Sequence, residues 1–155
     1  VGRPKAPIVY ENGCPDFQIG KAITLRDGRD VTLIANGLMV AAALDAADLL
    51  QQQGISARVL DMHTVRPLDE EAVEKAARET GAIVVAEEHL LYTGLASQVA
   101  MAAAKRHPVP MRFIGLYDYA ESGAPDALMR KYHLTADDIA REALELVNMR
   151  QGAVV

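Results

Sequence analysis

The sequence has 155 residues, half of them hydrophobic and 24% charged, which is typical of one soluble globular domain and excludes a disordered chain. The net charge is -5 and the 16 lysines and arginines are spread along the chain, so we expect neither a nucleic acid nor an anionic membrane as a partner. No apolar run approaches the roughly 20 residues of a membrane span, and the single cysteine, Cys14, suits a reducing compartment, so we expect a cytoplasmic protein.

Residues 1–20 form a leader punctuated by Pro and Gly, which we interpret as a connector from another domain. The rest of the chain, residues 21–155, alternates short β-branched runs with stretches rich in Ala and Leu, and we interpret it as one domain. The predicted strands are residues 22–26, 30–35, 56–62, 82–88 and 111–116. The predicted helices are residues 38–53, 69–79, 93–106 and 135–149.

The connections between these elements predict the sheet. Asp27 and Gly28 separate the first two strands, and an Asp-Gly pair in that position favours an antiparallel hairpin. The later strands are each separated by a helix, which favours right-handed crossovers between parallel strands covered on both faces. We therefore predict an α/β protein, a three-layer α/β/α sandwich around a five-stranded mixed sheet with one antiparallel edge strand.

The segment MHTVRPLDEE, residues 62–71, has the residue types of a small active site. Its acids are better explained as the start of a helix, with Asp69 as the N-cap and two glutamates in the first turn, where the helix dipole favours negative charge. The segment LTADD predicts a second start of this kind, with Thr135 and Asp138 in a capping box.

Polar candidates remain at the carboxyl ends of three predicted strands, the edge where open α/β sheets bind ligands. They are Gly37 after the second strand, His63 and Arg66 after the third, and Glu88 and His89 at the end of the fourth. Two carboxylates and an imidazole in AEEHLLYTG could bind a divalent metal or act as acid and base.

Each candidate also has a structural interpretation. Glu87 and Glu88 are adjacent, so on an extended strand they point to opposite sides, and no HExxH or CxxC spacing supports a metal site. No phosphate-binding motif surrounds Gly37, which favours a tight turn whose glycine allows close packing, and no nucleophile pairs with His63. Three classes stay open: a small enzyme, a ligand-binding or regulatory module, and a structural domain of a larger enzyme.

The blocks DVTLIANGLMVAAALDAADLL, GISARVLDMHTVRPLDEEAV, ETGAIVVAEEH, TGLASQVA and ESGAPDALMRKYHLTADDIA occur in this order. Together they resemble the C-terminal domain of the transketolase family of thiamine-diphosphate enzymes over essentially the whole chain. The MHTVRPLD and ESGAP segments are more similar to split bacterial transketolases, in which the C-terminal half is a separate polypeptide. The resemblance implies the same three-layer fold and a part in two-carbon ketol transfer between sugar phosphates.

The resemblance also implies which parts lie elsewhere. In the family, thiamine diphosphate and Mg²⁺ are held by a GDG motif and a following Asn in one domain, and a Glu in another activates the cofactor ring. GDG does not occur in this sequence. We therefore expect the chain alone to bind neither cofactor nor metal and to have no catalytic residue. Its expected partners are the cofactor-binding and pyrimidine-binding domains, within a homodimer that it helps to complete.

A few residues of the chain are given roles by the resemblance. Arg3 lies where the family has an Arg that binds substrate phosphate, and a guanidinium suits phosphate because it donates two parallel hydrogen bonds. His63 and Arg66 are expected to contact other domains.

Alternatives remain within and outside the family. The parent enzyme could be a 1-deoxyxylulose-5-phosphate synthase or the β subunit of a 2-oxo acid dehydrogenase. The chain could also be a separate module that binds a small ligand near Gly37, His63 and His89.

Overall fold

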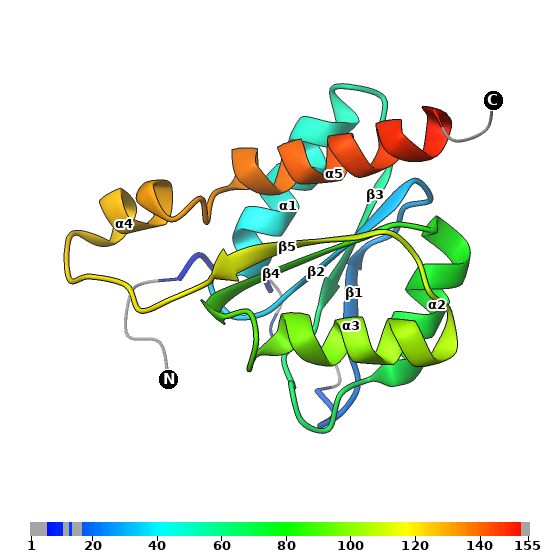
Figure 1. Cartoon of the computed structure of the whole chain (residues 1–155), viewed down its shortest axis with the longest axis horizontal. Helices are drawn as coiled ribbons and strands as arrows, with labels where there is room; N and C mark the ends of the chain where they lie inside the picture. The colour runs from blue at the N-terminus through cyan, green and yellow to red at the C-terminus, as the bar shows by residue number, and fades with distance from the viewer. Residues whose placement is uncertain (1–5, 11–12, 14–16, 153–155) are drawn as a thin grey trace.

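A five-stranded sheet lies between two layers of helices in the computed structural model, which describes residues 6–10, 13 and 17–152 (Figure 1). The strands are β1 (Ile23–Arg26), β2 (Val31–Ala35), β3 (Ala57–Asp61), β4 (Ile83–Leu90) and β5 (Met111–Leu116). The helices are α1 (Met39–Gln51), α2 (Glu70–Thr80), α3 (Leu95–Arg106), α4 (Pro125–Lys131) and α5 (Ala136–Gly152).

The order of strands in the sheet is β1-β3-β2-β4-β5. Strands β2, β3, β4 and β5 are parallel to one another, and β1 runs antiparallel to β3 at one edge. The predicted mixed five-stranded sheet, its antiparallel edge strand and its two covering layers are therefore confirmed.

The predicted hairpin between β1 and β2 is wrong. β1 pairs with β3 instead, with Ile23 opposite Asp61. The Asp-Gly segment crosses the start of β3, because a Cβ at Gly28 would lie 2.3 Å from the carbonyl carbon of Ala57, and Asp27 pairs with Arg58 at 2.9 Å. All five residues of β2 are buried, which suits a strand with neighbours on both sides, whereas no residue of β1 is fully buried. β1 is therefore the edge strand, but the Asp-Gly turn predicted β2 as its neighbour where the structure has β3.

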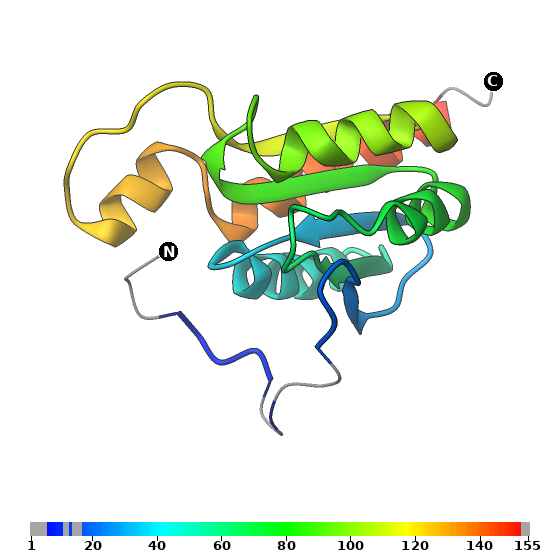
Figure 2. The same cartoon turned by 90° about the horizontal axis from the view of Figure 1, so that it is seen from below.

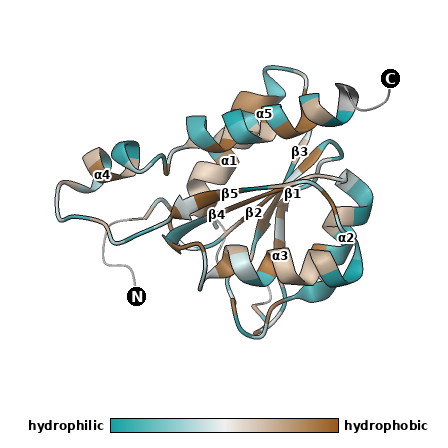
Figure 3. Ribbon diagram, in the orientation of Figure 1, coloured by the Kyte–Doolittle hydropathy of each residue, from teal (hydrophilic) through white to brown (hydrophobic). Residues whose placement is uncertain are grey.

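Two hydrophobic clusters, one on each face of the sheet, form the core. Consecutive strand residues alternate between them: Leu33 and Val84 belong to the cluster with α1 and α5, whereas Ile34 and Val85 belong to the cluster with α2 and α3. Figure 3 shows hydrophobic residues gathered along the central strands, with hydrophilic residues on the outer sides of the helices.

The start of α2 has the predicted cap. Asp69 Oδ1 accepts a hydrogen bond from the Ala72 amide at 3.1 Å, and Asp69 Oδ2 accepts one from the Ala22 amide just before β1 at 3.0 Å. The buried carboxylate therefore both starts the helix and holds the beginning of the edge strand.

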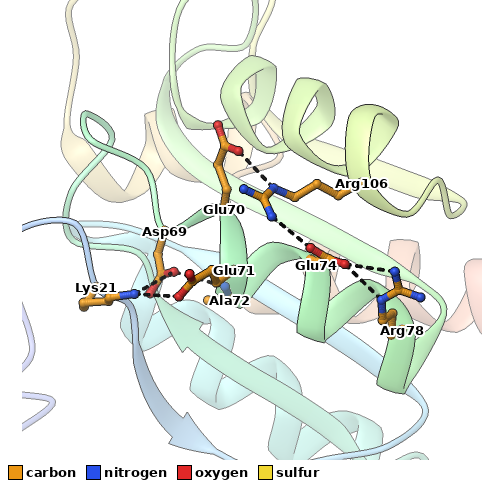
Figure 4. A network of polar contacts seen from close by, with 8 residues as sticks. All are labelled: Lys21, Asp69, Glu70, Glu71, Ala72, Glu74, Arg78 and Arg106. Atoms are coloured by element: carbon orange, nitrogen blue, oxygen red, sulfur yellow. Dashed lines mark hydrogen bonds and ion pairs between the residues drawn. The ribbon is translucent and has the colours of Figure 1, made fainter.

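Exposed ion pairs surround this cap (Figure 4). Lys21 contacts Glu71 at 2.9 Å, and Arg106 at the end of α3 reaches Glu70 at 3.0 Å and Glu74 at 2.9 Å. The hydrogen bond from Arg106 holds the pKa of Glu74 below its ordinary value. Glu70 and Glu71, which follow Asp69, therefore lie in the first turn of α2, as predicted. Both also form ion pairs at the surface.

The start of α5 also has the predicted capping box. Thr135 Oγ1 donates to Asp138 Oδ2 at 2.5 Å, and the Asp138 amide donates to Thr135 Oγ1 at 3.3 Å. Burial alone would raise the pKa of Asp138, but hydrogen bonds from Thr135, Arg141 and His133 outweigh it and lower that pKa.

Sequence patterns missed α4, which follows the polar segment after β5. Its N-cap is Ala124, which makes no side-chain cap, and Pro125 occupies the first turn. Among the described residues, no helix has the length and apolar character needed to cross a membrane.

Candidate functional site

The carboxyl ends of the four parallel strands meet at one edge of the sheet. β2 pairs with both β3 and β4, while the chain passes from β2 through α1 to β3 and then through α2 to β4. The strand order reverses its direction at β2, and such a point is the usual ligand position in open α/β sheets. The predicted candidates that the structure describes lie in the loops or strand extension at this edge.

His63 follows β3 and packs against the leader. Its ring lies over Phe17, with ring centroids 4.3 Å apart. Both ring nitrogens are buried, and among the described residues neither has a hydrogen-bond partner. Because β2 separates β3 from β4, roughly 10 Å of sheet lies between the strands that carry His63 and His89. The two imidazoles therefore belong to different parts of the edge.

Gly37 lies in the turn from β2 to α1, with a φ of 55°. A Cβ there would have nothing within 4 Å, so the predicted reason for this glycine, close packing, is wrong. The positive φ explains the glycine instead, since other residues adopt it at a cost. Helix α1 has no side-chain cap at Leu38. Gly37 thus shapes a tight turn.

Glu87 and Glu88 point to opposite sides of β4, as predicted. Glu87 is 1% exposed, and its carboxylate accepts hydrogen bonds from the Leu95 amide at 2.7 Å and the Ala96 amide at 2.8 Å. A Cβ at Gly94 would lie 2.0 Å from Glu87 Oε2, so only a glycine lets the carboxylate reach the start of α3. The side chain of Glu87 therefore caps a helix in a neighbouring layer.

Glu88 and His89 are exposed on the far end of β4. His89 Nδ1 lies 3.2 Å from the Leu90 carbonyl oxygen. Glu88 lines a groove of about 670 Å³ between α1 and α4, to which Gly37, His63 and His89 do not contribute. The structure therefore separates the candidates that would have formed one binding cleft.

The leader crosses the same edge. Tyr10 donates a hydrogen bond to Asp61 Oδ2 at 2.6 Å, and the Gly20 amide donates to Thr64 Oγ1 at 2.9 Å. Arg66 is exposed, one residue before a cis proline. Arg3, the predicted phosphate ligand, lies outside the described residues.

The buried carboxylates at this edge already accept hydrogen bonds within the domain and do not fit a magnesium diphosphate. Asp61, Asp69 and Glu87 are buried, and each accepts the hydrogen bonds described above. In residues 6–10, 13 and 17–152, no three His, Cys, Asp or Glu side chains are close enough to hold a metal ion. The described part of this edge therefore offers surfaces for packing and recognition.

Sequence reasoning missed two contacts at this edge, Tyr10 to Asp61 and Glu87 to α3. The first joins residues 51 positions apart and has no local signal. The second had a weak one, because Gly94 starts a helix without a capping side chain of its own. A helix start of that kind indicates that a group from elsewhere satisfies its amides.

Comparison with known proteins gives these features a context. The family model of the transketolase C-terminal domain matches residues 20–139. A 6-deoxy-6-sulfo-D-fructose transketolase subunit from Clostridium sp. (strain MSTE9) is 46% identical over 149 residues, covering 96% of this chain and 46% of that protein. An apulose-4-phosphate transketolase subunit from Phocaeicola vulgatus is 43% identical over 148 residues, covering 95% of this chain and 47% of that protein.

Other relatives agree with this family. A 1-deoxy-D-xylulose-5-phosphate synthase from Heliobacterium modesticaldum is 43% identical over 132 residues, covering 84% of this chain and 20% of that protein. A solved structure described as a split gene transketolase, an inactive β4 tetramer, superposes with a TM-score of 0.88 at 40% identity, covering 95% of this chain and 48% of that one. A transketolase from Leishmania mexicana, at 19% identity and a TM-score of 0.64, shares the fold.

The chain spans about half the length of the transketolase subunits that it matches. Sequence, fold and relatives agree: the chain belongs to the transketolase family and corresponds to its C-terminal domain.

Proposed function

We propose that the chain is the C-terminal part of a thiamine-diphosphate-dependent transketolase, which transfers a two-carbon ketol unit from a ketose to an aldose phosphate. The observation that carries the proposal is the similarity to two transketolase subunits over almost the whole chain. The working enzyme is a cytoplasmic homodimer that acts on sugar phosphates of the pentose phosphate type.

In this proposal the other domains hold thiamine diphosphate and Mg²⁺, which supply the nucleophile for ketol transfer. The chain contributes surfaces for the cofactor-binding and pyrimidine-binding domains. Arg66 is exposed in the loop from β3 to α2, where it would face such a partner, and His63 in the same loop would contact it through the leader residue Phe17. Residues 1–20 act as the connector and residues 21–155 as the domain.

The names of the relatives indicate the class of ketol donor. One is named for 6-deoxy-6-sulfo-D-fructose and the other for apulose 4-phosphate, so one sugar carries a sulfonate and the other a phosphate. We infer that the donor here is also a ketose with an anionic group at the end remote from the reacting carbonyl. Arg3 fits this role, because a guanidinium donates paired hydrogen bonds to either anion.

The test is a ketol-transfer assay with thiamine diphosphate, Mg²⁺ and each of these donors. The chain is assayed alone and after addition of a protein that carries the cofactor-binding and pyrimidine-binding domains. Activity in the mixture alone supports the proposal. Activity of the chain by itself contradicts it, because the proposal places the cofactor and its Mg²⁺ on other domains and the described residues include no cluster that could hold a metal ion.

Arg3→Ala tests the anion contact within the active mixture. Loss of a charged hydrogen bond is worth about 1.5–3 kcal/mol, so the KM for the anionic donor should rise about 10- to 100-fold. Arg29→Ala is the matched control, since Arg29 is exposed in the loop before β2, at the opposite edge of the sheet. If the KM for the donor were equal in both variants, Arg3 would not bind the anionic group of the donor.

A second candidate is 1-deoxy-D-xylulose-5-phosphate synthesis, favoured by the 43% identity to such a synthase. That relative covers a smaller share of this chain than the two transketolase subunits do. Formation of 1-deoxy-D-xylulose 5-phosphate by the same mixture, without ketol transfer, would select this alternative.

A further inference from the structure

The groove that Glu88 lines has walls from two helices at the carboxyl edge of the sheet. Leu38 and Ala42 contribute from the start of α1, and Leu128 and Met129 contribute from α4. Small alanines leave the hollow open, and a methionine adapts to differently shaped apolar partners. Grooves with such walls commonly bind an amphipathic segment of another protein.

The wall formed by α4 has little support within the chain. The helix has seven residues, none of them buried, while isolated helices shorter than roughly 12–15 residues are marginal in water. Met129 and Tyr132 pack in part against the core, and the other connections include an ion pair between Lys131 and Glu121 and a hydrogen bond from the Glu121 amide to Tyr132 Oη at 3.1 Å. Figures 1 and 2 show α4 standing away from both helix layers. A partner in the groove would add to the small apolar contact that α4 makes with the domain.

The charged residues that line the groove in the described part of the chain are all acidic. Asp45 on α1, Asp126 on α4 and Glu88 on β4 line it, and all three are exposed. None of the described lining residues is Lys, Arg or His. Carboxylates around an apolar floor attract a cationic partner and exclude an acidic one.

We propose that this groove docks an apolar segment bearing Lys or Arg, contributed by the part of the transketolase that holds the cofactor. The inference rests on the proposed function, which supplies that partner. Pro7 of the leader also lines the groove, while Val9 packs on the core and Tyr10 bonds to Asp61. The described part of the leader therefore lies beside the groove, and a partner domain joined to it would be tethered there, which raises the effective concentration of a weakly binding segment.

The experiment measures binding of the chain to the protein that carries the cofactor-binding and pyrimidine-binding domains, by calorimetry at low and high salt. Ala42→Arg fills the groove and places a cation where the partner's own cation would lie, so binding should weaken at least about 10-fold. Ala104→Arg is the matched control, because Ala104 is exposed on α3, on the opposite face of the sheet. Circular dichroism checks that both variants fold.

A charge-neutral variant tests the same groove without filling it. The triple substitution Asp45→Asn, Glu88→Gln, Asp126→Asn should weaken binding about 3- to 100-fold at low salt and flatten the salt dependence. Glu145→Gln, exposed on α5, should bind like the wild type.

The outcomes separate the two proposals. Ketol transfer in the mixture with unchanged affinity for Ala42→Arg and the triple variant would overturn the docking site and leave the proposed function standing. Self-association of the chain that Ala42→Arg abolishes, with the heterologous affinity unchanged, would assign the groove to a second copy and also overturn the inference. If the wild-type chain showed neither binding nor activity in the mixture, both the docking site and the proposed function would be contradicted.

Discussion

Glu87 and Glu88 are adjacent in sequence, but their side chains lie in opposite environments. The first is buried and caps α3 through two amides, whereas the second is exposed on the groove between α1 and α4. A carboxylate at the end of a strand is therefore not a sign of chemistry until its surroundings are known. Buried carboxylates here stabilise the domain, and the exposed one remains free to recognise a partner. Four substitutions can break or sharpen this contrast.

The largest effect is expected from Gly94→Ala. Its Cβ would collide with Glu87 Oε2 at 2.0 Å, so either the carboxylate or the start of α3 must move. Overpacking and lost amide hydrogen bonds should together reduce the free energy of unfolding by about 3 kcal/mol or more, measured by urea denaturation. Gly37→Ala meets only an unfavourable φ and should cost about 1 kcal/mol. Equal losses in the two variants would contradict the close approach at Gly94.

Glu87→Gln keeps the size of the side chain and removes its charge. One of the two amides at the start of α3 then faces an amide group in place of an oxygen, and the loss should be about 2 kcal/mol of unfolding free energy. Glu88→Gln, one residue away, should change stability by less than about 0.5 kcal/mol. If Glu88→Gln lost as much stability as Glu87→Gln, the claim that only the buried carboxylate stabilises the domain would be contradicted.

Tyr10→Phe tests whether the leader is held by a buried carboxylate. Asp61 is 7% exposed and accepts the phenol hydrogen bond at 2.6 Å, so the substitution should cost about 1.5 kcal/mol in thermal or urea unfolding. Tyr119→Phe changes a side chain that is 90% exposed and should have no measurable effect. An unchanged stability in Tyr10→Phe would show that the leader is held by other contacts.

Asp138→Asn should have the smallest effect, about 1 kcal/mol at neutral pH. Because the folded pKa of Asp138 is lowered, its contribution is present above the ordinary Asp pKa and is lost as the pH falls through the lower folded value. The difference from wild type should therefore shrink steadily as the pH is lowered below the ordinary Asp pKa, in urea unfolding measured as a function of pH. A difference that persists in acid would assign the effect to shape and not to charge.

The layers of the fold could be predicted because their signals are local. Runs such as IVVA are apolar over the length of a strand, and Asp69 and Thr135 precede helices as caps. The partner of β1 could not be predicted, because the Asp27-Gly28 turn favours a hairpin, while pairing with β3 depends on contacts between distant segments. Short helices with weak caps, such as α4, are missed for the opposite reason: their local signal is faint.

The sequence could predict where the candidate site lies, but not which residues form it together. Parallel strands bring their carboxyl ends to one edge, so Gly37, His63 and Glu88 were expected at the same side of the sheet. The direction of each side chain, and the surfaces that the leader and α4 cover, decide which of these residues share a cavity. The spacing of residues in the sequence predicts neither. Glu88 lines the groove, while His63 packs against Phe17.

The pairing of β1 with β3 also sets an order in time. A ribosome releases the chain from its amino end, so Ile23–Arg26 emerges before Ala57–Asp61 does. During that interval neither β1 nor β2 has a neighbour in the sheet, because both pair with β3. The sheet can therefore begin only when its third strand arrives between the first two.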